Sequence, residues 1–307
     1  MWFLMALVSA LLLGFYDVAK KYSLKGNAVI PVLFLTTLFS ALLFLPLIVG
    51  SRMGWLAPGS LLYVPSCEWA LHRWVVLKAL IVLGSWMCGY FAIKHLPLTI
   101  VGPVNAARPV IVVVGALLFF GERLNAWQWL GVGVAAIAFV LLGNTGRKEG
   151  ISFVRNRWVF LLVLAAILGA ASGLYDKYLM SRIGLHPFFV QSWFSLWQAV
   201  MMLVVLLVWW RSLKTAERPQ HGGFTWRGSI LLIPLFLSAA DACYFRALAD
   251  SDALIAVVSM VRRSSVIVSF VFGAIFFHEK QIRSKAADLL LLLLSMVFLC
   301  LGAMSEG

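Results

Sequence analysis

Residues 14–17 read GFYD, and the same pattern returns as GLYD at residues 173–176. Each tetrapeptide follows small residues spaced four apart, a spacing that lets membrane helices approach closely. Further along, VGALLFFGER (114–123) is answered by VFGAIFFHEK (271–280), an offset of 271 − 114 = 157 residues. Because the matches come in the same order in both halves, they predict an internal repeat.

The composition indicates a membrane protein. Hydrophobic residues make up 63% of the 307 residues and charged residues 12%, with a mean hydropathy of +0.97. Soluble domains hold about 45–50% apolar and about 25% charged residues. We therefore predict an all-α integral membrane protein. The net charge of +13 is not taken as a nucleic-acid footprint, because lysine and arginine gather in the loops on one side of membrane proteins.

The repeat and the apolar runs together predict two halves of five membrane-spanning helices. A helix needs about 20 apolar residues to cross the hydrocarbon core. With five spans each, the halves enter the membrane from opposite sides, and such inverted repeats hold a substrate site near the midplane between them. We expect repeat 1 at 1–145, a connecting loop at 146–157 and repeat 2 at 158–307. The ten predicted spans are 2–19, 29–50, 74–95, 98–120, 126–143, 158–181, 187–210, 228–249, 252–277 and 286–303.

The loop charges predict the orientation. Fifteen lysines and arginines follow the odd-numbered spans and five follow the even-numbered ones. The positive-inside rule assigns the richer side to the cytoplasm, so both termini are expected outside, in a multi-pass protein of the bacterial inner membrane.

Nothing in the sequence suggests a cofactor or a metal. The four cysteines show no CxxC spacing and the five histidines are dispersed. The segment GNTGRK (143–148) lacks the spacing of a phosphate-binding loop, so transport driven by ATP is not expected. The absence of HxxxH, GxSxG or clustered carboxylate motifs argues against an intramembrane enzyme.

The segment ARPVIVVVGALLFFGERLNAWQWLGVGVAAIAFVLL (107–142) resembles the hallmark of the drug/metabolite transporter superfamily, in particular its EamA-type members. A looser copy begins at Arg262, and the resemblance covers essentially the whole chain. It implies a solute carrier with two five-span repeats, acting in export, and it leaves the solute open. Many members of the superfamily place both termini in the cytoplasm, opposite to the orientation that the loop charges predict.

Arginines inside the predicted spans are the strongest candidates for a binding site, because charged groups in a membrane are costly and are either functional or paired. Arg262 and Arg263 lie near the middle of span 9 and point about 100° apart. We expect one to face the cavity and the other to pair with a carboxylate such as Asp241. Arg108, with Asn105 one turn before it, is the rough counterpart of Arg262 in span 4.

Carboxylates and tyrosines complete the candidate site. Asp17 pairs with Lys21 at i+4 or takes part in proton coupling, and Asp176, its repeat mate, has no such neighbour. Both are therefore candidates for coupling or gating, together with Asp241. Glu279 lies at a helix end and is expected to cap a helix or pair with a loop charge. The tyrosines that accompany these motifs are candidate cavity residues: Tyr16, Tyr90, Tyr175 and Tyr244.

These observations predict a secondary active transporter, and by the family resemblance an exporter. Its substrate is expected to be a small organic metabolite with an anionic group. The alternatives are a lipid-linked or polyprenyl-phosphate flippase and a cationic drug exporter, and midplane arginines disfavour the latter. The expected partners are the substrate, protons or another coupling ion and the lipid bilayer, with no nucleic acid, and the chain acts as a monomer or homodimer. The predicted substrate-binding residues are Arg262, Arg263, Arg108, Asn105, Tyr16, Tyr90, Tyr175 and Tyr244.

Overall fold

The computed structural model describes residues 2–60, 62–111, 114, 124–148, 151, 153, 155–215, 223–248, 258, 261–277, 279 and 281–304. Within these residues the chain forms ten α-helices, one short 3₁₀ helix and no strand. The helices of the first half are α1 (Trp2–Leu24), α2 (Val29–Arg52), η1 (Trp69–Leu71), α3 (His72–His95), α4 (Leu98–Ala106) and α6 (Ala126–Lys148). Those of the second half are α7 (Arg157–Ser181), α8 (Pro187–Thr215), α9 (Ser229–Leu248), α11 (Ser265–Phe276) and α12 (Ile282–Met304).

The described helices have the length and the surface of membrane-spanning helices. Seven candidate spans are long and apolar enough to cross a bilayer, and they lie at α1, α2, α3, α6, α7, α8 and α12. Large apolar side chains stand on their outer faces, such as Leu207 at 55% and Leu290 at 66% exposure. Such a surface is stable against lipid and not against water. The prediction of an all-α integral membrane protein is confirmed.

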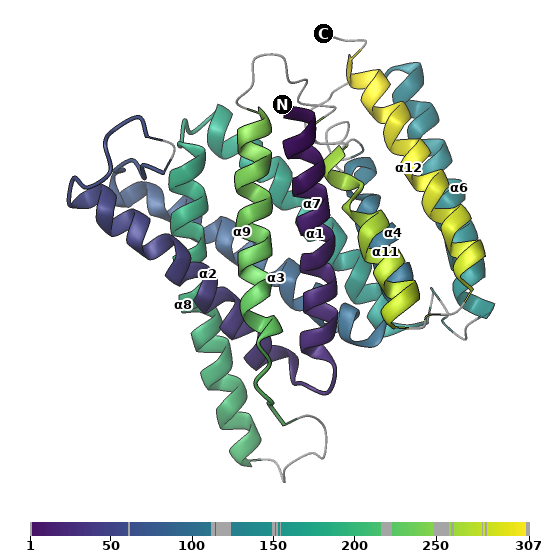
Figure 1. Cartoon of the computed structure of the whole chain (residues 1–307), viewed down its shortest axis with the longest axis horizontal. Coiled ribbons are helices and arrows are strands. Elements are labelled where there is room, and N and C mark those ends of the chain that lie inside the picture. Colours follow the sequence, from purple (N-terminus) through teal and green to yellow (C-terminus); the bar gives the residue numbers. More distant parts are fainter. Residues whose placement is uncertain are drawn as a thin grey trace.

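The two ends of the chain lie at the same end of the helix bundle. Figure 1 shows the start of α1 and the end of α12 together at the top, and the end of α8 at the bottom. An even number of crossings requires this arrangement. Spans 4 and 9 are represented by α4 and α11, since 112–113, 115–123 and 249–257 lie outside the described residues.

The most extensive helix contacts join the first half of the chain to the second. The principal pairs are α1 with α9, α3 with α7, α2 with α8, α6 with α12 and α4 with α11. Further contacts of α1 with α11 and of α3 with α8 are matched by contacts of α7 with α4 and of α9 with α2. Exchanging every helix for its counterpart in the other half returns these contacts, whereas others, such as those of α4 with α12 and of α1 with α3, have no counterpart of similar extent among the described helices. The most extensive contacts thus join helices of opposite halves, so each half depends on the other for its packing.

Spans 4 and 9 are both broken near their middle. The α4 helix ends before Ala107, and the N–H of Val110 donates to the carbonyl of Ala107, three residues back, at 3.0 Å. Pro109 contributes to this break, because it has no N–H to donate to the carbonyl four residues before it. In span 9 the same spacing occurs at Ser264, whose carbonyl accepts from Ile267 N–H at 2.9 Å. The two breaks are 264 − 107 = 157 residues apart, which is the offset between the repeated sequence segments.

The start of α4 is held by the second half of the chain. The Glu279 carboxylate accepts hydrogen bonds from the backbone N–H groups of Leu98, at 2.6 Å, and Thr99, at 2.8 Å. The first N–H groups of a helix have no partner within the helix, and a carboxylate there also interacts favourably with the helix dipole. Lys285 of α12 donates to the Thr99 hydroxyl at 2.9 Å. The expectation that Glu279 caps a helix is confirmed, and the capped helix belongs to the other half.

Gly14 and Gly173 occupy the same position in the two tetrapeptides and provide a matched test of helix packing. A Cβ atom on Gly14 would overlap the side chain of Val268 on α11, whereas a Cβ on Gly173 would meet nothing within 4 Å among the described residues. We expect Gly14→Ala to destabilise the protein by about 1–3 kcal/mol, the usual cost of overpacking. Gly173→Ala should be neutral or slightly stabilising, because alanine favours the helix.

Thermal unfolding of the two purified variants in the same detergent measures this difference. Equal melting temperatures for both variants would show that α1 and α11 are not in the close contact that the structure describes.

Candidate substrate cavity

A cavity of about 380 Å³ lies between the two halves of the chain. It is bordered by α1, α3 and α4 from the first half and by α7, α9 and α11 from the second, at the level of the two helix breaks. Of the residues predicted for the substrate site, seven line it: Tyr16, Tyr90, Asn105, Arg108, Tyr244, Arg262 and Arg263.

Arg262 is neutralised by a carboxylate on a neighbouring helix. It forms an ion pair with Asp241 of α9, in which the two side chains are 19% and 20% exposed. Its guanidinium carbon also lies 4.3 Å from the ring centre of Tyr244, over the ring face, where a cation is attracted to the π-electrons. The expected pairing with Asp241 is therefore present. Of the two adjacent arginines, Arg262 is the one whose charge is balanced within the protein.

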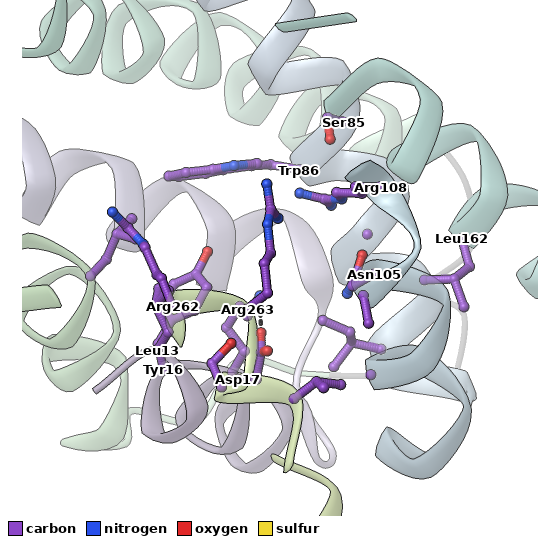
Figure 2. A pocket seen from close by; sticks show the side chains of 18 of the residues that line it. Leu13, Tyr16, Asp17, Ser85, Trp86, Asn105, Arg108, Leu162, Arg262 and Arg263 are labelled. Carbon is purple, nitrogen blue, oxygen red and sulfur yellow. Dashed lines mark ion pairs between the residues drawn. The ribbon is translucent and has the colours of Figure 1, made fainter. Parts of the chain in front are cut away.

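Arg263 stands in the cavity. Its side chain is more exposed than that of Arg262, although helices surround it, because it projects into the open space. Among the residues that the structure describes, no carboxylate lies within ion-pairing distance of Arg263. Figure 2 shows its guanidinium directed towards that of Arg108, below the ring of Trp86. The two positive charges are close enough to disfavour each other electrostatically.

Arg108 is held against the backbone of α7. An ideal Cβ atom on Gly169 would lie 2.9 Å from the guanidinium carbon of Arg108, so only glycine leaves room for this side chain there. The Nε atom of Arg108 is buried and makes no hydrogen bond with the described residues. The Oδ1 atom of Asn105, one turn earlier, is also buried and without a partner in the same part of the chain. A donor and an acceptor without partners are thus adjacent in the wall of the cavity, where burial makes them costly.

Asp17 forms an ion pair that the sequence analysis assigned to the wrong lysine. It pairs with Lys20, with a nitrogen–oxygen distance of 2.7 Å, and not with Lys21. Lys21 donates instead to the carbonyls of Ile93, at 2.7 Å, and Leu96. The correction has a simple reason: the carbonyls at the end of α3 lack partners within that helix and attract the terminal ammonium of Lys21.

Tyr175 and Asp176 lie outside the cavity lining. The Tyr175 hydroxyl donates to the carbonyl of Trp74 at 3.2 Å, away from the arginines. Asp176 pairs with Lys78 of α3, with a nitrogen–oxygen distance of 2.6 Å. The repeated tetrapeptides therefore place their aspartates differently, because Asp17 faces the cavity whereas Asp176 joins α7 to α3.

Lys20 and Trp86 are among the cavity residues that the sequence analysis did not predict. Lys20 was counted as a loop charge, but it is 7% exposed and its ammonium lies 3.9 Å from the ring centre of Tyr16. Its spacing of three residues from Asp17 and four from Tyr16 was the available signal, since such residues share a helix face. Trp86 had no distinguishing pattern within an apolar helix. Among the described residues no group of three or more histidine, cysteine or acidic side chains could hold a metal ion.

The sequence and the fold of this chain are similar to those of known membrane transport proteins and of a solved structure. A model of the EamA-like transporter family matches residues 1–144. The probable 4-amino-4-deoxy-L-arabinose-phosphoundecaprenol flippase subunit ArnE of Aeromonas salmonicida (strain A449) is 34% identical over 83 residues, 26% of this chain and 72% of that protein. Protein RarD of Streptomyces exfoliatus is 24% identical over 243 residues, 78% of this chain and 66% of its own. A solved crystal structure superposes with a TM-score of 0.59 at 15% identity, covering 97% of each chain, which shows likeness of fold.

The pairing of Arg262 with Asp241 predicts a specific pattern in a double-mutant cycle. Asp241→Asn leaves a partly buried guanidinium without its counter-charge, so we expect a loss of about 1–3 kcal/mol of stability. Arg262→Gln should cost a similar amount, and the double variant should cost less than the sum of the two. Thermal unfolding of the four proteins measures the coupling. Strictly additive losses would mean that the two side chains do not interact.

Proposed function

Because the chain belongs to the EamA-like transporter family, we propose that it is a secondary active transporter that exports a small organic metabolite with an anionic group. The observation that carries the proposal is the cavity between the halves, where Arg108 and Arg263 point to one region and neither forms an ion pair with a carboxylate of the described residues. Guanidinium groups bind carboxylates and phosphates through paired hydrogen bonds. The same positive charges oppose the entry of a cationic drug.

Alternating access between two inverted halves is the proposed mechanism. We assign repeat 1 to residues 1–145, the connection to 146–157 and repeat 2 to 158–307. The matched helix contacts support this division, because every principal pair joins the two halves. Broken helices around a central site are a recurring feature of such carriers, and the breaks at Ala107 and Ser264 border the cavity. One half rocking against the other would expose the arginines to each side in turn.

The three aspartates are proposed to couple or gate this movement. Asp17 and Asp241 neutralise cations in the cavity wall, and Asp176 ties α7 to α3 through Lys78. A proton on one of these carboxylates would cancel its charge and release the paired cation. The pair at Asp176 joins helices from opposite halves. Its opening would therefore loosen the contact between them.

A flippase for a lipid-linked phosphate is the second candidate. The similarity to the ArnE subunit favours it, since that protein's described substrate contains a phosphoundecaprenol group. The match covers 26% of this chain, whereas the cavity draws on both halves. We therefore rank transport of a water-soluble anion first. The two candidates differ in whether the protein recognises the anionic group alone or requires the lipid chain as well.

A ligand screen on the purified protein tests the proposed site. Anionic metabolites at saturating concentration should raise the melting temperature of the wild type, because a ligand that binds the folded state stabilises it by about 2.7 kcal/mol at one hundred times its Kd. The Arg108→Gln and Arg263→Gln variants should bind the same compounds with at least tenfold lower apparent affinity, measured from the ligand concentration needed to raise the melting temperature. Polyprenyl phosphates in the same screen identify a lipid substrate.

Arg246→Gln is the matched control, because Arg246 also lies in the second half and is exposed outside the cavity lining. It should bind the hits as the wild type does. Hits that stabilise the two cavity variants and the wild type equally would place the binding site elsewhere.

The proposed location is the bacterial inner membrane with both termini outside, as the loop charges predict. In a background without the four native cysteines, Ser305→Cys should react with a membrane-impermeant maleimide on intact cells. Gly223→Cys, in the connection to α9 at the opposite end of the bundle, should react only after permeabilisation. The reverse pattern would establish termini in the cytoplasm.

A further inference from the structure

The numbers of cationic and acidic side chains in the cavity indicate how many negative charges its substrate carries. Four cationic side chains line it, Lys20, Arg108, Arg262 and Arg263. Two carboxylates neutralise two of them, Asp17 for Lys20 and Asp241 for Arg262. The described part of the cavity therefore carries an excess of 4 − 2 = +2 charges. Resting on the proposed transport function, we propose that the substrate presents a dianionic phosphate monoester to Arg108 and Arg263.

The two excess charges favour a dianion over the other anionic metabolites. A zwitterionic amino acid would leave both positive charges uncompensated inside the protein, and a monocarboxylate or a phosphodiester would leave one. Uncompensated charge in a low-dielectric site is unfavourable, so affinity should rise with each negative charge that the ligand supplies. A dianion returns the cavity to neutrality.

The arrangement of the arginines favours placing both negative charges on one group. Figure 2 shows the two guanidinium groups approaching each other below Trp86, one from span 4 and one from span 9. The three terminal oxygens of a phosphate monoester can accept from both guanidinium forks at once. A dicarboxylate separates its charges along a carbon chain and suits arginines that stand apart.

Asn105 adds a second requirement. Its buried Oδ1 atom accepts no hydrogen bond from the described residues and lies one helical turn from Arg108. A hydroxyl or amino group on the substrate next to the phosphate would supply the missing donor. Phosphorylated polyols and amino alcohols have this pattern, so the site fits a small polar phosphate monoester.

Two ligands that differ in the second negative charge of the phosphate test whether the site requires a dianion. Methyl phosphate and dimethyl phosphate differ by one methyl group, and only the monoester becomes a dianion, with a second pKa of about 6. At pH 8 we expect methyl phosphate to raise the melting temperature with at least tenfold higher apparent affinity than dimethyl phosphate. Lowering the pH to 5 should weaken methyl phosphate about tenfold, because the dianion is then about a tenth of the ligand, and should leave dimethyl phosphate unchanged.

The Arg108→Gln and Arg263→Gln variants distinguish a failure of the dianion inference from a failure of the proposed transport function. If monoester and diester stabilise the wild type equally and both depend on Arg108 and Arg263, the anion site stands and the dianion inference is overturned. Succinate binding more tightly than methyl phosphate would also overturn it in favour of a dicarboxylate. If no anion stabilises the protein in a manner that depends on these arginines, both proposals fail. Arg246→Gln again serves as the control that keeps the wild-type response.

Glycerol 3-phosphate and a short-chain phosphatidate identify the source of the phosphate monoester. Both present the same dianionic group, one on a soluble metabolite and one on a lipid. Stronger stabilisation by glycerol 3-phosphate assigns the site to a soluble phosphate, and stronger stabilisation by phosphatidate assigns it to a lipid headgroup. A lack of response to both, with a response to succinate, overturns the phosphate inference.

Discussion

The cost of placing a guanidinium charge inside a membrane protein organises this structure. For Arg262 that cost is offset by the ion pair with Asp241 and by the cation–π contact with the ring of Tyr244. Arg263 and Arg108 receive no such partner from the described residues, and they keep their charge available to the cavity. Adjacent residues in one sequence thus serve opposite purposes, because a helix turns successive side chains by about 100°. A charge left without a partner at such cost is the physical reason for proposing a binding site here.

Close packing at small residues brings these charges together. Gly14 lets α11 approach α1, and Gly102 lets it approach α4, since a Cβ there would lie 2.6 Å from the Val266 side chain. Because Gly169 has no side chain, the Arg108 guanidinium packs directly against α7. The breaks in spans 4 and 9 lie at the cavity, and the Glu279 carboxylate holds the start of α4. Interrupted helices around a central site are a recurring feature of carriers whose site faces two directions in turn.

The repeated sequence has taken on different tasks in the two halves. The principal contacts between the halves are unchanged when the halves are exchanged, so this part of the backbone architecture is close to symmetric. The side chains are not. Asp17 lies in the cavity beside Lys20, whereas Asp176 pairs with Lys78 on another helix, and Gly14 is tightly packed where Gly173 is open. A near-symmetric frame with an asymmetric cavity is what a site for an asymmetric solute requires.

The sequence alone determined the membrane class, the ten apolar runs, the repeat and most of the charged residues of the cavity, because burial of apolar surface and the cost of intramembrane charge act on local composition. It also identified Asp241, from depth alone, as a partner for one of the two adjacent arginines, without deciding between Arg262 and Arg263. Only the tertiary structure decided that Arg262 takes the carboxylate while Arg263 has no ion pair with the described residues, that Lys20 and not Lys21 pairs with Asp17, and that Tyr175 lies elsewhere. Those outcomes depend on which helix stands opposite each face, and contacts between distant segments leave no periodic trace in the sequence.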